Sequence, residues 1–243
     1  MRYETASITR QGDRAENQDR CAVAGSGTAF LLLLADGMGG HPRGELAAQV
    51  FIDSLLRQFD EQREPVAPEF LPQAFTRAHA DIIAAGQQAM PPVEPCTTGV
   101  ACLVGNGTAC WAHVGDSRLY LLRNDAIQAR TRDHSYVEEL IQLGELAEAD
   151  REQHPLRNYV TQALGGSAGP PEVTLTGSVT LEPGDVLLLC SDGLWAALPE
   201  TRLLELAGAG SLQAAVEKLA VTAEGNSSPL SDNVTLLALR TST

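Results

Sequence analysis

The sequence predicts an α+β fold in which two antiparallel β-sheets form a central sandwich flanked by pairs of helices. Short segments that are β-rich, or that alternate apolar and polar residues, predict strands, and two pairs of longer segments predict helices. The strands follow one another through short turns such as Asn106-Gly107 and Asn124-Asp125, which favour antiparallel hairpins. Pairs of helices around runs of strands indicate layers, with the helices outside two sheets.

The individual elements follow from local pattern. Strands are expected at residues 4–9, 20–24, 30–35, 99–104, 109–114, 118–123, 126–130, 172–181, 186–190 and 234–240. Helices are expected at residues 44–59, 68–86, 199–207 and 212–223, with a shorter helical pattern at 136–143. In the first helix Ala47, Phe51, Leu55 and Phe59 recur at every fourth position, which produces a broad buried stripe.

Composition limits the number of domains and the kinds of partner. A chain of 243 residues with 44% hydrophobic content is sufficient for one sizeable core, so a single domain over residues 1–243 is expected. The formal net charge of −14 disfavours binding to nucleic acids and to anionic membranes. The beginning of the sequence has no apolar stretch typical of a signal peptide, and no apolar run is long enough to span a membrane.

The cysteines indicate a reducing compartment. Five cysteines are scattered along the chain, and none forms a Cys-x-x-Cys pair. We therefore expect reduced, mostly buried thiols and a cytoplasmic location.

Four aspartates lie at the tips of predicted strands. Asp36, Asp116 and Asp192 each follow an apolar run, and Asp232 precedes another. In an antiparallel sheet the end of one strand lies beside the start of its neighbour, so these carboxylates can share one edge. Gathered carboxylates offer the hard oxygen ligands that Mg²⁺ and Mn²⁺ prefer, and the pattern indicates a metal-dependent hydrolase, most simply a phosphatase.

Neighbouring residues support a site at this edge. Three glycines in the four residues Gly37–Gly40 allow the backbone to approach a ligand closely. Arg14 has a planar guanidinium that can bind a phosphate through two hydrogen bonds. Taken singly, an Asp-Gly pair is an ordinary turn and an arginine an ordinary surface residue, so the weight lies in their combination.

Several motifs in fixed order together resemble one family. They are Arg14-x-x-Asn17-Gln18-Asp19, Asp36-Gly37-Met38-Gly39-Gly40-His41, Thr97-Thr98-Gly99, Gly115-Asp116-Ser117-Arg118, Asp133-His134-Ser135, His154-Pro155-x-Arg157-Asn158, Ser191-Asp192-Gly193 and Ser231-Asp232-Asn233. With this set the chain resembles the bacterial branch of the type 2C (PPM) metal-dependent serine/threonine protein phosphatases. The resemblance covers nearly the whole chain and implies the same sandwich of two antiparallel sheets with helices outside.

The resemblance also implies a ligand set for Mn²⁺ or Mg²⁺, with two or three ions bound. Asp36 would bridge two ions, while Asp192 and Asp232 would complete the shell of the first. The carbonyl of Gly37 would bind the second ion, and Asp19 would act mainly through metal-bound water. Water activated by the metals would then hydrolyse phosphoserine and phosphothreonine on proteins.

Further roles are implied outside this set. Asp116, together with Asp192, would hold a weaker third ion, and Arg14 would bind the substrate phosphate. Eukaryotic relatives carry a histidine at the position of Met38, and here the nearest histidine is His41. His41 could be the general acid, a substrate contact or a loop residue.

The resemblance also implies that the segment of about residues 133–164 is a flap beside the cleft. The alternative is that this segment is a surface excursion without a role in the chemistry. The expected partners are phosphorylated proteins and a cognate serine/threonine kinase, with the enzyme a monomer.

Other classes of protein fit less well. No cysteine is followed six positions later by arginine, which excludes a cysteine-dependent phosphatase, and no phosphate-binding loop, His-Glu-x-x-His zinc motif or EF-hand is present. Two alternatives stay open: a non-catalytic binding module with the same fold, and a phosphatase of small phosphate metabolites. All five metal aspartates are in place, which argues against the binding module.

Overall fold

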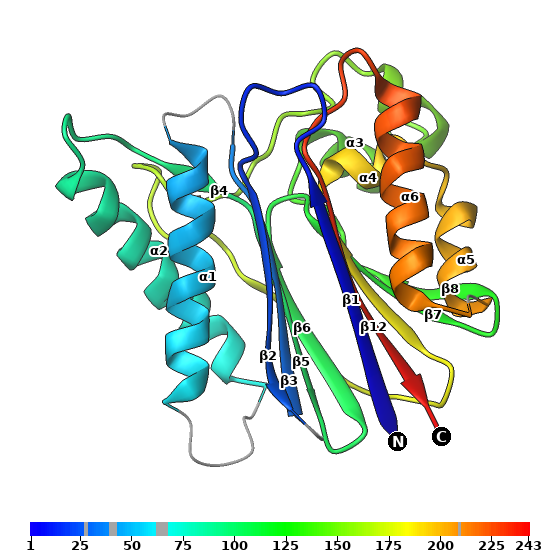
Figure 1. Ribbon diagram of the computed structural model, residues 1–243. Coiled ribbons are helices and arrows are strands. Elements are labelled where there is room, and N and C mark those ends of the chain that lie inside the picture. Colours follow the sequence, from blue (N-terminus) through cyan, green and yellow to red (C-terminus); the bar gives the residue numbers. More distant parts are fainter. Residues whose placement is uncertain (27–28, 39–42, 62–67, 209) are drawn as a thin grey trace.

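The computed structural model describes residues 1–26, 29–38, 43–61, 68–208 and 210–243. Two five-stranded antiparallel sheets lie face to face, with helices on the outer side of each (Figure 1). The two chain ends lie close together at one end of the sandwich (Figure 1). The predicted fold class is confirmed.

The first sheet has the strand order β10-β6-β5-β3-β2. Its strands are β2 (Asp19–Ser26), β3 (Ala29–Asp36), β5 (Gly99–Gly105), β6 (Thr108–Val114) and β10 (Thr174–Thr180). The outer face of this sheet is covered by α1 (Gly44–Asp60) and α2 (Phe70–Gln88). The Phe51 and Phe75 rings of these two helices meet edge to face, with centroids 5.1 Å apart.

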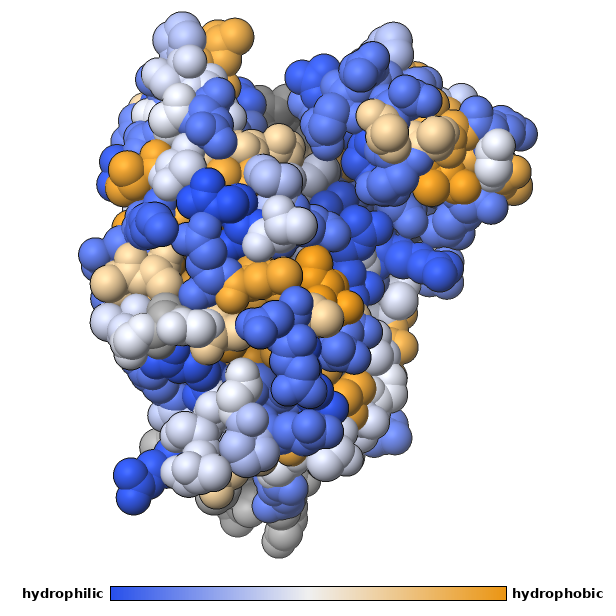
Figure 2. All heavy atoms as spheres, turned by 90° about the vertical axis from the view of Figure 1, so that its right-hand side faces the viewer, coloured by the Kyte–Doolittle hydropathy of each residue, from blue (hydrophilic) through white to orange (hydrophobic). Residues whose placement is uncertain are grey.

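The second sheet has the order β1-β12-β11-β7-β8. Its strands are β1 (Arg2–Arg10), β12 (Val234–Ser242), β11 (Val186–Cys190), β7 (Arg118–Arg123) and β8 (Ala126–Arg130). The outer face is covered by α6 (Leu212–Ser227) and by the short helices α4 (Asp192–Trp195), η2 (Glu200–Leu204) and α5 (Glu205–Gly208). The molecular face that carries α5 and α6 is mainly hydrophilic and is hollowed near its top between two lobes (Figure 2).

The apolar run before Asp36 is explained by burial on both faces of β3. Leu31 and Leu33 pack against α1 and α2, whereas Leu32 and Leu34 pack between the sheets. Successive side chains of a strand point to opposite faces, so a strand covered on both sides needs apolar residues at every position.

Local geometry agrees with most predicted boundaries. Asn106, Asn124 and Asp125 adopt positive φ values of 51°, 52° and 55°, as tight antiparallel hairpins require. The helix predicted at residues 199–207 is instead η2 followed by α5. The two-residue strands β4 (Cys96–Thr97) and β9 (Leu164–Gly165) were not predicted, because two residues show no periodicity.

The five cysteines are unpaired, and all except Cys21 are buried. Within the described part of the chain, no helix combines the length and the apolar character that a membrane crossing demands.

Candidate metal centre and substrate cleft

Residues from both sheets meet at one end of the sandwich. The register of β2 and β3 places Asp19 directly opposite Asp36, and Asp116 follows β6 in the same sheet. From the second sheet, Asp192 begins α4 directly after β11, and Asp232 lies just before β12. A cleft of ≈ 730 Å³ is lined by Arg14, Ala15, Glu16, Gln18, Asp36, Gly37, Met38, Thr98, Asp116, Asn158, Tyr159, Val160, Asp192, Asp232 and Asn233.

The Asp36-Gly37 turn is fixed by the β4 region. The carbonyl of Asp36 accepts hydrogen bonds from Thr98 N at 2.9 Å and Thr97 Oγ1 at 2.8 Å. Gly37 lies opposite Thr97 in an isolated antiparallel bridge. The two hydrogen bonds of this bridge are made by the flanking residues, from Thr98 N to Asp36 O and from Met38 N to Cys96 O, so the bridge does not use the Gly37 carbonyl. A Cβ at Gly37 would lie 2.5 Å from the backbone of Gly44, so only glycine allows α1 to begin this close.

Asp19 connects the two sheets. Ser191 Oγ, just after β11, donates to Asp19 Oδ2 at 2.7 Å and accepts a bond from Thr235 N at 3.0 Å. Asp19 is 1% exposed, and its Oδ1 has no hydrogen-bond partner among the described residues. An unpartnered buried carboxylate oxygen is costly, and a water molecule on a metal ion would satisfy it.

The carboxylates at this end raise one another's pKa values. Burial, together with the negative charges of Asp19, Asp192 and Asp116, raises the pKa of Asp36 well above its ordinary range. Burial and the charge of Asp116 do the same for Asp192. Burial raises the pKa of Asp19 to about 6. A bound cation would offset this repulsion and favour the ionised carboxylates.

Asp116 has a buried side chain, and hydrogen bonds to the backbone of Asp116 and Gly115 hold it in place. Burial and the charge of Asp133 raise its pKa to about 7. The backbone carbonyl of Asp116 accepts a hydrogen bond from Trp195 Nε1 at 3.0 Å. The preceding residue, Gly115, makes two hydrogen bonds with His134: Gly115 N donates to His134 Nδ1 at 3.3 Å, and His134 N donates to Gly115 O at 2.9 Å.

The loop that carries Arg14 is attached to the start of β12. Asn233 Nδ2 donates to Gln11 O at 2.8 Å and Glu16 O at 3.0 Å, and Asn233 Oδ1 accepts from Gln18 N at 2.8 Å. Asp13 Oδ2 accepts from Ser231 N and Ser231 Oγ at 3.0 and 2.8 Å. No role was predicted for Asn233, Ser231 or Asp13, although the first two belong to a family motif.

Arg14 lies at the cleft with its side chain 56% exposed. Its Nη2 donates to Asp232 Oδ2 at 2.6 Å. This bond, and the negative charge of Asp232, raise the pKa of Arg14 above its ordinary value. The residue expected to bind phosphate therefore pairs here with one expected to bind metal, and its role in phosphate binding stays a prediction. His41 lies outside the described residues.

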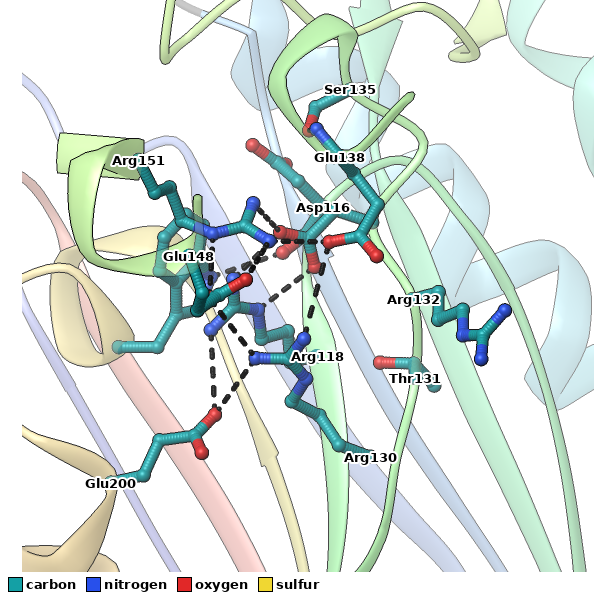
Figure 3. A network of polar contacts seen from close by, with 12 residues as sticks. Asp116, Arg118, Arg130, Thr131, Arg132, Ser135, Glu138, Glu148, Arg151 and Glu200 are labelled. Carbon is teal, nitrogen blue, oxygen red and sulfur yellow. Dashed lines mark hydrogen bonds and ion pairs between the residues drawn. The ribbon is translucent and has the colours of Figure 1, made fainter. Parts of the chain in front are cut away.

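A network of charged side chains lies beside Asp116 and connects β7 to the expected flap (Figure 3). Arg118 makes a two-pronged pair with Asp133, from Nε to Oδ1 at 2.8 Å and from Nη2 to Oδ2 at 2.7 Å, and lies 3.7 Å over the Trp195 ring. Arg151 Nη1 reaches Asp133 Oδ2 at 3.3 Å, and Nη2 also donates to Glu138. The side chains of this network come from β7, from α3 (Tyr136–Gln142) and from the 3₁₀ helix η1 (Glu148–Gln153), and Asp133 lies in the loop before α3.

The expected flap reaches the cleft after η1. Asn158, Tyr159 and Val160 line the cleft, whereas Arg157 and His154, which belong to the same motif, are not in its lining. The bridge between Ser135 and Val160 closes the segment at its base.

The donor set fits divalent cations with water in their shells. Among the described residues, no three His, Cys, Asp or Glu side chains form a ready-made cluster around one ion. Mg²⁺ is typically held by one or two carboxylates with several waters, so a cleft lined by Asp36, Asp192 and Asp232 together with Gly37 is suited to it. The unpartnered Asp19 Oδ1 and the raised pKa of Asp36 fit a site for cations.

Sequence comparison identifies similar proteins. The family model described as protein phosphatase 2C matches residues 9–230. The serine/threonine phosphatase stp of Listeria innocua is 33% identical over 211 residues, which are 85% of this chain and 82% of that protein. The serine/threonine protein phosphatase PstP of Mycobacterium tuberculosis is 35% identical over 227 residues, which are 92% of this chain but 42% of PstP.

Solved structures agree over the whole chain. The Streptococcus agalactiae serine/threonine phosphatase superposes with a TM-score of 0.88 at 30% identity, with 99% of this chain and 100% of that chain covered. The PstP catalytic domain in complex with two manganese ions superposes with a TM-score of 0.83 at 29% identity, with 99% of each chain covered.

Proposed function

The chain belongs to the protein phosphatase 2C family, and we propose that it hydrolyses phosphoserine and phosphothreonine on proteins with Mn²⁺ or Mg²⁺ bound among Asp36, Asp192 and Asp232. The expected family, enzyme class and type of cofactor are confirmed by its relatives, which are serine/threonine phosphatases, one of them with two manganese ions.

The convergence of carboxylates from both sheets on one cleft carries this proposal. Asp36 comes from the first sheet, and Asp192 and Asp232 flank strands of the second. Burial, together with the charges of neighbouring aspartates, raises the pKa values of Asp36 and Asp192, and a non-catalytic binding module has no need to gather such carboxylates. The mutual repulsion is instead expected of a cation site.

The residues of the site would have separate roles. Bound divalent ions supply Lewis acidity and lower the pKa of water at the cleft. Asp36 would bridge two ions, with Gly37 offering its carbonyl, and Ser191 would orient Asp19 toward metal-bound water through its hydrogen bond. Asp116 and Asp192, which both line the cleft, would hold a third ion. We call residues 133–164 the flap segment.

Arg14 would stabilise the substrate phosphate. Its exposed guanidinium already lies in the cleft on a loop fixed by Asn233, so it needs only to exchange Asp232 for a phosphate oxygen. The leaving serine or threonine oxygen takes up a proton, and His41 or a water molecule is the proposed source.

The finer expectations stay proposals. The flap segment shapes access to the cleft. This proposal is supported by Asn158, Tyr159 and Val160, which belong to the flap segment and line the cleft. We propose a single-domain monomer in the cytoplasm that opposes a bacterial serine/threonine kinase. The five unpaired cysteines support a reducing compartment.

The first test is hydrolysis of p-nitrophenyl phosphate and of a phosphothreonine peptide with Mn²⁺, with Mg²⁺ and with excess chelator. Metal-dependent turnover of both substrates is expected. Turnover of p-nitrophenyl phosphate without turnover of the peptide would favour small phosphate metabolites as substrates. No turnover of either, in folded protein, would favour the binding module.

A further inference from the structure

Exposed apolar side chains are concentrated on the flap segment. Among the described residues, ten large hydrophobic side chains are exposed, and four of these lie between positions 136 and 159. They are Tyr136 at 36%, Leu143 at 71%, Leu156 at 47% and Tyr159 at 59% exposure. The chain as a whole is strongly acidic, with a net charge of −14, so a local excess of apolar surface at this place calls for an explanation.

Three of these residues are held next to one another and to His154 by hydrogen bonds and one ring contact. The backbone N–H of Tyr136 donates to Tyr159 O at 3.0 Å, and that of Tyr159 donates to Leu156 O at 3.0 Å. The rings of Tyr136 and His154 are 5.9 Å apart, and Leu156 N donates to His154 Nδ1 at 3.2 Å. We call Tyr136, His154, Leu156 and Tyr159 the rim patch.

The rim patch is continuous with the substrate cleft. Tyr159 belongs to both, since it lines the cleft between its neighbours Asn158 and Val160. A chain that places its phosphorylated residue in the cleft therefore passes beside the rim patch if it leaves on this side.

The patch is held in position by the buried network at its base. Arg151, three residues before His154, is 5% exposed and pairs with Asp133, Glu138 and Glu148. Ser135 caps the start of α3 by accepting a bond from Glu138 N at 3.3 Å. Both ends of the patch are thus anchored, so its apolar side chains are exposed on a fixed framework and little ordering is needed for binding.

We propose that the rim patch binds an apolar side chain of the phosphoprotein substrate, close in sequence to the phosphorylated residue. An extended chain advances about 3.3 Å per residue, so three residues span roughly 10 Å. Because Tyr159 itself lines the cleft, the contact is expected at a position near the phosphorylated residue. The selected substrates are phosphorylation sites with a neighbouring leucine, isoleucine, methionine or aromatic residue. The inference rests on the proposed phosphatase activity and adds sequence preference to it.

The test compares phosphothreonine peptides that differ at one position. In an otherwise polar peptide, leucine replaces serine at each of the three positions on either side of the phosphothreonine, and kcat/KM is measured with Mn²⁺ present. Leucine in at least one position should raise kcat/KM by about three- to tenfold, the range expected for partial burial of one leucine side chain. The effect should be seen mainly in KM.

Variants of the patch identify the contact. L156S and Y159S should remove the leucine preference, whereas L156M and Y159F, which keep apolar surface, should retain it. V221S is the matched control, because Val221 is a 54% exposed apolar residue on α6, outside the cleft. It should leave the preference unchanged.

The outcomes separate the two proposals. Equal kcat/KM for all peptides, or a leucine preference that persists in both L156S and Y159S, overturns the rim patch but leaves the phosphatase intact. If wild-type protein hydrolyses neither p-nitrophenyl phosphate nor any peptide, the proposed function itself fails.

Discussion

Ser191 and Asp19 form a hydrogen bond that joins the two sheets at the edge of the cleft. Ser191 Oγ donates to Asp19 Oδ2 at 2.7 Å across 172 positions of sequence. This bond uses one carboxylate oxygen, and the other is buried with no hydrogen-bond partner among the described residues. The motif Ser191-Asp192-Gly193 therefore contributes both an expected ligand and the residue that orients a neighbouring carboxylate.

Replacing Ser191 by alanine should weaken metal binding without unfolding the protein. Loss of an outer partner of this kind typically costs about 10–100-fold in metal affinity or activity. We expect S191A to raise the Mn²⁺ dissociation constant measured by calorimetry and to lower turnover in proportion. T76A, which removes an exposed hydroxyl bonded to Pro72 O on α2, is the control. Unchanged Mn²⁺ affinity in S191A would show that the bond has no part in the metal centre.

Replacing Asp36 or Asp192 by alanine should remove nearly all activity. Direct ligands matter more than outer partners, so a loss of more than about a hundredfold in kcat/KM is expected. The fold should persist, because each substitution also removes a repelled carboxylate with a raised pKa. Circular dichroism checks the fold, and turnover of p-nitrophenyl phosphate measures activity. Wild-type turnover in either variant would contradict the assignment of the metal site.

Replacing Arg118 by methionine should strongly destabilise the protein. The substitution leaves Asp133 buried with only the weaker contact to Arg151, and removing one partner of a buried pair costs about 3–5 kcal/mol. The control is R57M, since the pair of Arg57 with Asp81 is half-exposed and should contribute at most about 1 kcal/mol. Urea unfolding measures both. Similar small losses in the two variants would rule out a structural role for the network.

The pH dependence of stability should depend on Asp116. Its pKa in the folded protein, about 7, lies above that of an unfolded chain, about 3.9. The folded state therefore keeps this proton to higher pH, and the stabilisation is complete below about pH 4 and is lost as the pH rises to about 7. D116N cannot ionise. With chelator present, the free energy of unfolding of D116N minus that of wild type should increase by at least about 1 kcal/mol from pH 4 to pH 7.

Urea unfolding of D116N and wild type at several pH values provides the measurement. A constant difference between pH 4 and 7 would show that the pKa of Asp116 is not raised. With saturating Mn²⁺ the wild-type protein should lose less stability over the same interval, because the cation favours the ionised carboxylates.

The sequence by itself determined the layered fold, the family and the residues expected at the site. Leu31–Leu34 predicted a strand because burial on both faces requires apolar residues at every position. The aspartates at strand tips predicted a shared edge because antiparallel neighbours bring ends and starts together.

Only the tertiary structure decided how these residues are held. The bond between Ser191 and Asp19, the attachment of the Arg14 loop by Asn233 and the pairing of Arg118 with Asp133 link distant segments. Such contacts depend on how segments apart in the chain pack together and leave no periodic signal in the sequence, so the motifs reveal the residues but not their partners. The rim patch belongs to the same class, because Tyr136 and Tyr159 become neighbours only when the flap segment closes on itself.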